Sequence, residues 1–325
     1  EDHFFSLFHF AVFVYSLGSM KAAIGIDIGG TKIAVTLGTE RGKILLREEF
    51  PTPVQKNVRK AVPLIAEIIR RFQITAKLKK LQVLGVGIAA PGAVDPSSGV
   101  IPYSPNMPGW KNFPICKRLK ASLRAPLFLA NDANAAACAE KIFGTAKKAS
   151  DFVYVTVSTG IGGGIFCNNQ LVEGAGFSAG EVGHVCVVPG GRLCGCGRKG
   201  CLEAQSSGTA IGKIFSELAG GRYSAKQTAQ LAAQKNIKAL KAFEIAGDDL
   251  GKGLAMIMNT VNPSLIILGG GVLKSAPSIF LKKAIARCRK AAWPMAFKSC
   301  RIKKSLLRGS AGDLGALALV FLNRR

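Results

Sequence analysis

Apolar residues fall in short runs that end in glycine along the first part of the chain. Residues 22–39, AAIGIDIGGTKIAVTLGT, form two apolar runs around a glycine turn, which predicts a β-hairpin. A third strand is expected at 43–50, and residues 58–72 have the apolar spacing of an amphipathic helix. Residues 83–92, VLGVGIAAPG, read as a buried strand that ends in a proline-glycine turn.

A similar order of elements returns later in the chain. Residues 152–160 and 162–172 again form a strand, a glycine turn and a strand, and a further buried strand is expected at 265–271. This repetition predicts two related α/β domains with a cleft between them. We expect an N-terminal domain over 20–130, a C-terminal domain over 131–311, and a helix at about 312–325 that packs back on the first domain.

The first 19 residues do not fit this pattern. Their apolar run, 4–17, is shorter than the roughly 20 residues of a membrane span, and no basic segment precedes it as in a signal peptide. Met20 opens a stretch that reads like the natural start of a cytoplasmic protein. We interpret residues 1–19 as upstream sequence joined in error; the alternative is a short membrane-associating segment.

Charge and cysteine content narrow the class of protein. The 325 residues include 44 basic and 19 acidic ones, a formal charge of +25. The basic residues are dispersed in short runs, which favours a basic surface that attracts anions over a specific nucleic-acid site. Only three of the nine cysteines cluster, a pattern typical of a reducing cytoplasm and one metal site.

The turn of the first hairpin is a candidate phosphate loop. In DIGGTK the two glycines let backbone N–H groups approach a phosphate chain, while a hydroxyl and an ammonium follow. The acidic residue is suited to orient Mg²⁺ through water. The alternative is a glycine hairpin with an ordinary acidic residue. The candidate residues are Asp27, Gly29, Gly30, Thr31 and Lys32.

Two further glycine loops follow buried strands. STGIGGGI, 158–165, has the same strand–turn–strand setting, and LGGGV, 268–272, is placed to flank an adenosine. One glycine loop is weak evidence, but three in this context favour a nucleotide site. The candidate contacts are Thr159, Gly160, Gly162, Gly270 and Gly271.

A carboxylate and an amide mark two other candidate contacts. Asp132 falls where a buried strand meets an alanine-rich helix, a junction at which ligand groups gather, and phosphoryl transfer to a hydroxyl needs a carboxylate that can accept the proton. The alternative is that Asp132 or Asn131 only caps the helix that begins near Ala133. Asn106, in a proline-rich loop, offers a donor and an acceptor to adjacent hydroxyls, or is a simple turn residue.

Residues 181–203 combine metal ligands with two carboxylates. One imidazole and three thiolates suit a tetrahedral structural Zn²⁺ with no open position, and the CxC spacing disfavours a redox-active pair. The candidate ligands are His184, Cys194, Cys196 and Cys201. Glu181 and Glu203 bracket this segment and suit bidentate hydrogen bonding to neighbouring hydroxyls; alternatively both are surface residues.

Taken together these motifs resemble those of the ROK (repressor, open reading frame, kinase) family. DIGGTK, APGAVD, PNMPGW, LANDANAAACAE, STGIGGGI, EVGHV, CGCGRKGCLEA and LGGGV occur in the family's order, from residue 24 to about 272. The resemblance implies a two-domain actin-like ATPase (ribonuclease H-like) α/β fold with an interdomain cleft. It also implies ATP- and Mg²⁺-dependent phosphorylation of a hexose or amino sugar.

The resemblance also assigns roles to residues. It implies that Asp132 is the general base, and that the zinc ion clamps the sugar-binding glutamates in place. A cytoplasmic homodimer or homotetramer is expected, without a specific nucleic-acid or membrane partner. The sugar contacts that it implies are Gly92, Asn106, Asn131, Asp132, Glu181, His184 and Glu203.

Several functions stay open at this point. Glucose, phosphorylated at its 6-hydroxyl, is the favoured substrate; N-acetylmannosamine, N-acetylglucosamine and fructose are alternatives, as is polyphosphate in place of ATP. A sugar-responsive repressor is disfavoured, because the 26 residues before Asp27 are too few for a DNA-binding domain. A non-sugar ATPase of the actin-like class is disfavoured by the metal motif and the paired glutamates.

Overall fold

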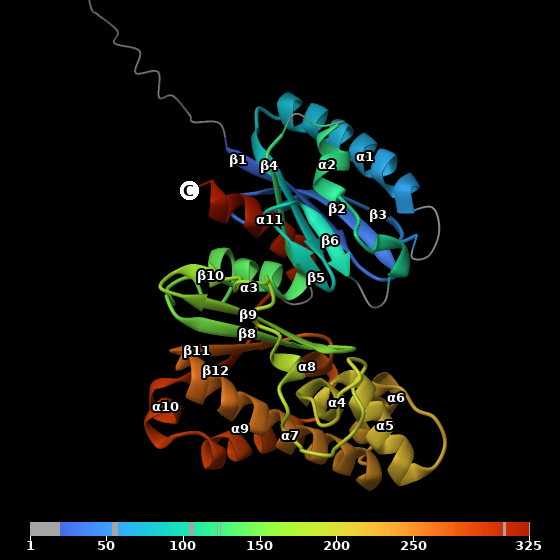
Figure 1. The fold of residues 1–325 in the computed structure, drawn as a ribbon, viewed down its shortest axis with the longest axis vertical. Helices are drawn as coiled ribbons and strands as arrows, with labels where there is room; N and C mark the ends of the chain where they lie inside the picture. The colour runs from blue at the N-terminus through green and yellow to red at the C-terminus, as the bar shows by residue number, and fades with distance from the viewer. Residues whose placement is uncertain are drawn as a thin grey trace, which may run out of the picture.

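The computed structural model describes residues 20–53, 58–103, 107–121, 123, 125–307 and 310–324. The predicted extension at 1–19 and the predicted contact Asn106 lie outside the described residues. Within those residues, two five-stranded sheets are stacked with helices outside and between them (Figure 1). In the same part of the chain, no helix combines the length and apolar character that a membrane span requires.

The N-terminal sheet has the order β3-β2-β1-β4-β7. The predicted hairpin is confirmed, since β1 and β2 pair antiparallel, and β4 and β7 extend the sheet in parallel on the other side of β1. The strand predicted at 43–50 is also found. The bounds are Lys21–Ile28 (β1), Lys32–Thr39 (β2), Ile44–Pro51 (β3), Gln82–Ala90 (β4) and Leu127–Asn131 (β7).

Helices α1 (Val58–Leu78) and α2 (Ile115–Lys120) cover the outer face of this sheet (Figure 1). The helix predicted at 58–72 therefore exists and continues to Leu78. Alternate residues of β1, such as Ile24 and Ile26, are fully buried in this outer core. A small hairpin of β5 (Ala93–Asp95) and β6 (Val100–Tyr103), and the short helix η1 (Pro108–Trp110), lie beside it.

The C-terminal sheet repeats the same strand order, β10-β9-β8-β11-β12. An antiparallel meander of β8, β9 and β10 is again extended by parallel strands, here β11 and β12. Both sheets thus open with a hairpin and continue with parallel strands, as the sequence predicts. The bounds are Phe152–Val157 (β8), Ile161–Cys167 (β9), Gln170–Val172 (β10), Leu265–Gly269 (β11) and Arg301–Lys304 (β12).

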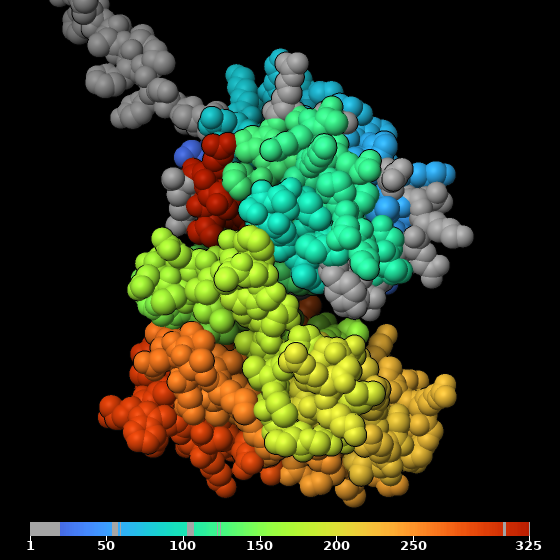
Figure 2. All heavy atoms as spheres, in the orientation of Figure 1, coloured from blue at the N-terminus to red at the C-terminus, as the bar shows by residue number. Residues whose placement is uncertain are grey.

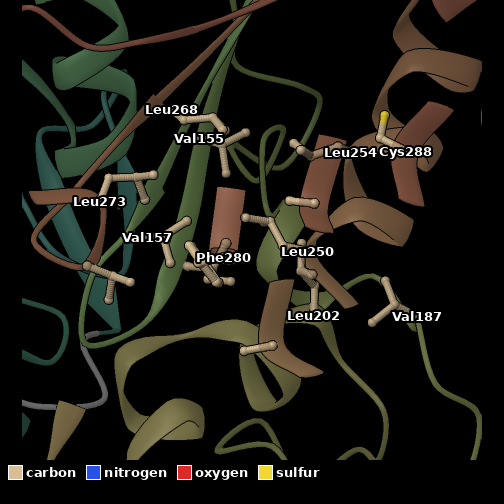
Figure 3. Close-up of a cluster of buried hydrophobic side chains, with 14 of the residues drawn as sticks. Val155, Val157, Val187, Leu202, Leu250, Leu254, Leu268, Leu273, Phe280 and Cys288 are labelled. Carbon is tan, nitrogen blue, oxygen red and sulfur yellow. The ribbon is translucent and has the colours of Figure 1, made fainter. Parts of the chain in front are cut away.

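A group of helices covers the outer face of the C-terminal sheet (Figure 1). Val155 and Val157 of β8 point into this core, toward Leu250 and Leu254 of α7 and Phe280 of α9 (Figure 3). The helices are α4 (Leu202–Ser206), α5 (Gly208–Ala219), α6 (Ala225–Ala233), α7 (Ile237–Val261), α8 (Val272–Ser275), α9 (Ser278–Ala291) and α10 (Pro294–Ser299).

Two helices fill the space between the sheets. Helices α3 (Asp132–Ile142) and α11 (Ala311–Asn323) pack on each other and on the inner faces of β9 and β1. Glycines in the strands make this close approach possible. A Cβ on Gly87 of β4 would overlap the Ala316 carbonyl of α11, and one on Gly164 of β9 would lie 2.6 Å from the Ala137 Cβ of α3. The inner strand faces are therefore shaped for these two helices.

Candidate active site

Three adjoining cavities lie between and beside the two sheets. The central cavity, of about 460 Å³, runs between the loops Gly29–Gly30 and Ser158–Gly160. The lysine cavity, of about 480 Å³, shares Asp132 with it and contains Lys274 and Lys304. The outer cavity, of about 920 Å³, shares Thr159 with the central cavity. Figure 2 shows the surface hollowed between the upper and lower halves of the molecule.

Most of the residues predicted from sequence meet at these cavities. Asp27, Gly270 and Gly271 line the lysine cavity. Among the described residues, Thr31 and Lys32 line neither the central nor the lysine cavity. The predicted residues that line the central cavity are Gly29, Gly30, Gly92, Asn131, Asp132, Thr159, Gly160, Gly162, Glu181, His184 and Glu203.

Asp132 is the first residue of α3 and projects into the shared wall of two cavities. The side chain is open to solvent yet surrounded by protein on most sides. This burial raises the pKa of Asp132 to about 6. The Ala133 N–H, 2.8 Å from Oδ1, opposes the rise, and the negative Glu181 adds to it. A carboxylate in this range is ionised at neutral pH and is a competent proton acceptor.

Asn131, not Asp132, caps the helix. Its Oδ1 accepts from the N–H groups of Ala133 (2.8 Å) and Asn134 (3.4 Å). Its Nδ2 donates to the carbonyl of Gly92 at 2.9 Å. Gly92 has a φ of +83°, a conformation that favours glycine. The amide of Asn131 therefore ties β7 to the Pro91–Gly92 turn. The Asp132 carboxylate shares the Ala133 N–H with Asn131 and lines the cavities.

Asp27 lies on the inner face of β1 because side chains alternate along a strand. Its carboxylate lies directly against the Cα of Gly312 at the start of α11. Burial, and then the negative charges of Asp313 and Asp132, raise the pKa of Asp27 to about 6. Carboxylates that repel one another in this way are a favourable setting for a divalent cation, whose binding relieves the repulsion.

The first glycine loop has a tight turn with one open position. The Gly29 N–H donates to the Lys32 carbonyl at 2.9 Å, and the Thr52 hydroxyl donates to the Gly29 carbonyl at 2.6 Å. A Cβ at Gly30 would meet no atom within 4 Å, so this backbone faces free space. The ammonium of Lys32 instead pairs with Glu49 across the sheet, with 2.8 Å between Nζ and Oε2.

The second glycine loop is held by α5. The Gly208 N–H donates to the Ser158 carbonyl at 2.7 Å, and the Thr209 hydroxyl donates to the Thr159 carbonyl at 2.9 Å. Gly162 lies beyond this loop, in β9, where a Cβ would come within 3.1 Å of the Ala133 Cβ. The absence of a side chain at Gly162 thus serves packing against α3 as well as the cavity wall.

The third glycine loop crosses close to β8. Gly270 has a φ of +97°, and a Cβ there would overlap the backbone of Val157. Gly271 follows as the residue before α8 and lines both the lysine and the outer cavity. Gly270 therefore lets the end of β11 approach β8 where the cavities meet, whereas a Cβ at Gly271 would make only an ordinary contact with Ser158.

One imidazole and three thiols form a compact cluster beside the central cavity. The potential ligand atoms of His184, Cys194, Cys196 and Cys201 all lie within 4.8 Å of one another. The Cys196 and Cys201 sulfurs are 3.7 Å apart, as are the Cys194 sulfur and His184 Nδ1. Zn–S bonds of about 2.3 Å place two tetrahedral sulfurs about 3.8 Å apart. The kinds of ligand atom and these two separations therefore fit a tetrahedral zinc ion.

The same cluster touches both predicted glutamates. His184 Nε2 is 3.8 Å from Glu181 Oε2, on the opposite side of the ring from the sulfurs. The Cys194 sulfur is 3.8 Å from Glu203 Oε1, and Glu203 Oε2 accepts from the Ile161 N–H at 2.9 Å. Leu202 and Val187 anchor this segment in the outer core of the C-terminal sheet (Figure 3).

Two residues near the site were not predicted from sequence. Arg192 connects the cluster to the outer cavity, since it donates to Gln205 at 3.0 Å and pairs with Glu217 of α5 at 2.9 Å. Phe177 lines the central cavity in a left-handed backbone conformation, with a φ of +55°. An arginine in a glycine-rich segment and an aromatic between glycines are the only local signals for these roles.

Comparison with known proteins gives consistent matches over most of the chain. The model of the ROK family matches residues 23–322. The glucokinase of Thermotoga maritima is 33% identical over 313 residues, 91% of this chain and 96% of that protein. The xylose repressor of Caldicellulosiruptor bescii is 30% identical over 311 residues, 91% of this chain and 77% of that protein.

Solved structures agree with these matches. The ROK hexokinase from Thermus thermophilus superposes with a TM-score of 0.83 at 32% identity, over 93% of this chain and 98% of that one. A ROK glucokinase from Streptomyces griseus, solved with glucose and AMPPNP, gives 0.72 at 31% identity, over 92% and 98%. The predicted actin-like ATPase fold, with two α/β halves around a cleft, is confirmed.

Proposed function

Because the chain belongs to the ROK family, we propose that it is an ATP-dependent hexose kinase that transfers the γ-phosphate to the 6-hydroxyl of glucose. One observation favours this most. The ionisable carboxylate of Asp132 lies between two glycine loops and in the same cavity as Glu181, His184 and Glu203. A phosphate-binding side and a hydroxyl-binding side thus meet at a potential general base.

The central cavity is the proposed sugar site. The Gly92 turn and the side chains of Asn131, Glu181, His184 and Glu203 all line this cavity and provide donors and acceptors for ring hydroxyls. Glu203 keeps one oxygen on the Ile161 N–H, which fixes the orientation of its carboxylate. The predicted contact Asn106 belongs to the same proposal.

The glycine loops and the outer cavity are the proposed ATP site. The loops Gly29–Gly30 and Ser158–Gly160 both line the central cavity. The N–H groups of Gly29 and Ser158 are bonded within their own turns, so the phosphate chain is assigned to the backbone N–H groups of Gly30, Thr159 and Gly160. The outer cavity adjoins the second loop and has room for adenosine beside Tyr223 and Gly271. Asp27 would hold Mg²⁺, which when bound supplies charge neutralisation on the phosphates.

In the proposed reaction Asp132 accepts the proton of the sugar hydroxyl. The hydroxyl oxygen forms a bond to the γ-phosphorus, the bond from that phosphorus to the β–γ bridging oxygen breaks, and ADP leaves. The raised pKa of Asp132, about 6, keeps the carboxylate basic enough to take the proton while it remains ionised at pH 7. The two sheets on either side of the cavity allow closure around both substrates.

Zinc has a structural role in this proposal. Because His184 faces the sulfurs with one nitrogen and Glu181 with the other, an ion at the cluster would fix the imidazole and, through it, the sugar-binding carboxylate. All nine cysteines, each within the described ranges, are free thiols, in keeping with the proposed cytoplasmic location. We further propose a division into domains at 20–130 and 131–311, and a homodimer or homotetramer.

A coupled ADP-release assay with MgATP tests the proposal across a panel of hexoses, and direct measurement of the sugar phosphate tests inorganic polyphosphate as donor. We expect glucose-dependent ADP release, which Asp132→Asn abolishes. ATP turnover that depends on no sugar would favour a different ATPase of this fold. The match to xylose repressors supports a second candidate, a sugar-responsive regulator. Sugar binding without turnover, together with a mobility shift that survives raised salt, would favour that candidate.

A further inference from the structure

A fourth cavity lies on the other side of Phe177 from the proposed sugar site. This side cavity, of about 600 Å³, lies between β7, β10 and the end of α11. Leu127, Leu319 and Leu322 contribute apolar walls, and Gln170 and Glu173 contribute polar ones. Among the described residues, Phe177 alone lines both this cavity and the central cavity. Its side chain therefore forms part of the partition between them.

The backbone of Phe177 is held in an unusual conformation. A φ of +55° is rare for a bulky residue, and such residues concentrate at ligand-binding sites where the surrounding structure enforces them. The enforcing contacts come from its own loop. The Phe177 N–H donates to the Gly174 carbonyl at 3.2 Å, and the Ala179 N–H donates to the Glu173 carbonyl at 3.0 Å. The loop thus fixes the aromatic ring at the cavity wall.

The partition has a direct consequence for which hexose fits. With the sugar 2-position placed toward Phe177, a hydroxyl there stays within the central cavity, whereas a larger substituent there meets the residue that lines both cavities. The side cavity behind that ring has the groups that complement an acetamido substituent. The Glu173 carboxylate accepts from an amide N–H, the Gln170 amide donates to a carbonyl, and the leucines suit a methyl group.

On the basis of the proposed kinase function, we propose that Phe177 is a specificity-determining residue that excludes 2-acetamido hexoses. Its ring closes the central cavity against the side cavity, so glucose binds and N-acetylglucosamine or N-acetylmannosamine does not. Removal of the ring joins the two cavities and makes room for the acetamido group. Phe177 takes no part in proton or phosphate transfer.

The experiment compares kcat/KM for glucose with kcat/KM for the two N-acetylated sugars, with MgATP as donor. Phe177→Gly and Phe177→Asn remove the ring, and both residues tolerate a positive φ, so the loop is expected to fold. We expect the ratio of acetamido sugar to glucose to rise at least about tenfold in both variants. Phe177→Leu, which keeps the bulk, and Ser178→Ala, which changes the adjacent exposed residue, should leave the ratio within about threefold.

Several results would overturn the proposal. An unchanged ratio in both ring-deletion variants would do so, as would a wild-type protein that already phosphorylates N-acetylglucosamine as well as glucose. Where a variant loses turnover of every sugar, calorimetric titration with N-acetylglucosamine decides, because binding no tighter than that of the wild type contradicts the joined cavity. A wild-type protein that phosphorylates no hexose would instead refute the proposed function.

Discussion

The pH dependence of phosphoryl transfer provides the most quantitative test of the site. In the structure, burial raises the pKa of Asp132 to about 6. A general base acts only when it is ionised, so activity should fall as the pH drops through this value. Roughly nine-tenths of a group with this pKa is ionised at pH 7 and roughly one-tenth at pH 5. The expected loss in kcat/KM for glucose is therefore about tenfold over that interval.

A second carboxylate, that of Asp27, predicts different pH profiles for the two substrates. Burial and the nearby Asp313 and Asp132 raise the pKa of Asp27 to about 6 as well. In the proposed mechanism Mg²⁺ bound at Asp27 would hold that carboxylate ionised, so kcat/KM for glucose at saturating MgATP should depend on Asp132 alone. In contrast, kcat/KM for MgATP at saturating glucose depends on both carboxylates in the metal-free protein. That parameter should fall by about 100-fold from pH 7 to pH 5.

The assay is ADP release measured in small pH steps, with thermal unfolding followed at each pH to confirm that the protein stays folded. Asp132→Asn keeps the size of the side chain and removes the proton acceptor. It should lower kcat by at least about 10²-fold and abolish the acidic limb of the profile. A flat profile for the wild type, or an acidic limb that persists unchanged in Asp132→Asn, would refute the assignment of Asp132 as the base.

Three further perturbations test other parts of the site. Gly30→Val should raise the KM for MgATP at least about tenfold while the protein folds normally, because the new side chain enters the free space assigned to the phosphates of ATP. An unchanged KM would contradict the assignment of this turn as a phosphate loop. Cys196→Ser should lower the zinc content, measured by metal analysis, from about one ion per chain. Calorimetry should show glucose binding weakened more than ATP binding; a zinc-free protein with full glucose affinity would refute the structural role of zinc. Gly164→Val should lower the free energy of unfolding by about 1–3 kcal/mol, because the new Cβ would lie 2.6 Å from the Ala137 Cβ. Thermal denaturation measures this loss, with Gly176→Ala as the control because a Cβ there meets no atom within 4 Å.

The strands and the hairpins were predictable because their signals are local. Apolar runs ending in glycine, such as 22–39, predict their own pairing whatever the rest of the chain does. The choice between Asn131 and Asp132 as helix cap was not predictable, because both residue types prefer that position. The structure resolves it, because Asn131 Oδ1 accepts from the N–H groups of Ala133 and Asn134 while the Asn131 amide donates to the Gly92 carbonyl in a distant turn.

The packing role of two strand glycines was not predicted from the sequence. Gly87 and Gly164 lie in apolar runs and read as parts of strands or ligand loops, but the structure uses them to admit α11 and α3. Their partners Ala316 and Ala137 are distant in sequence or on another element, so no local pattern reveals the contact. Similarly, the Lys32–Glu49 pair depends on the register of β2 with β3, in which Ala34 is opposite Glu49. The position of Phe177 between two cavities was likewise not predictable, because those cavities are lined by residues from distant parts of the chain.

The contact between Gly312 and Asp27 has a consequence for how the protein is made. The strand that carries Asp27 is synthesised before α11, and residues 132–310 lie between the two after β7. Until α11 leaves the ribosome, the inner face of β1 and β4 stays uncovered, with glycines where a helix belongs. The N-terminal sheet therefore completes its inner core only when α11 docks on it.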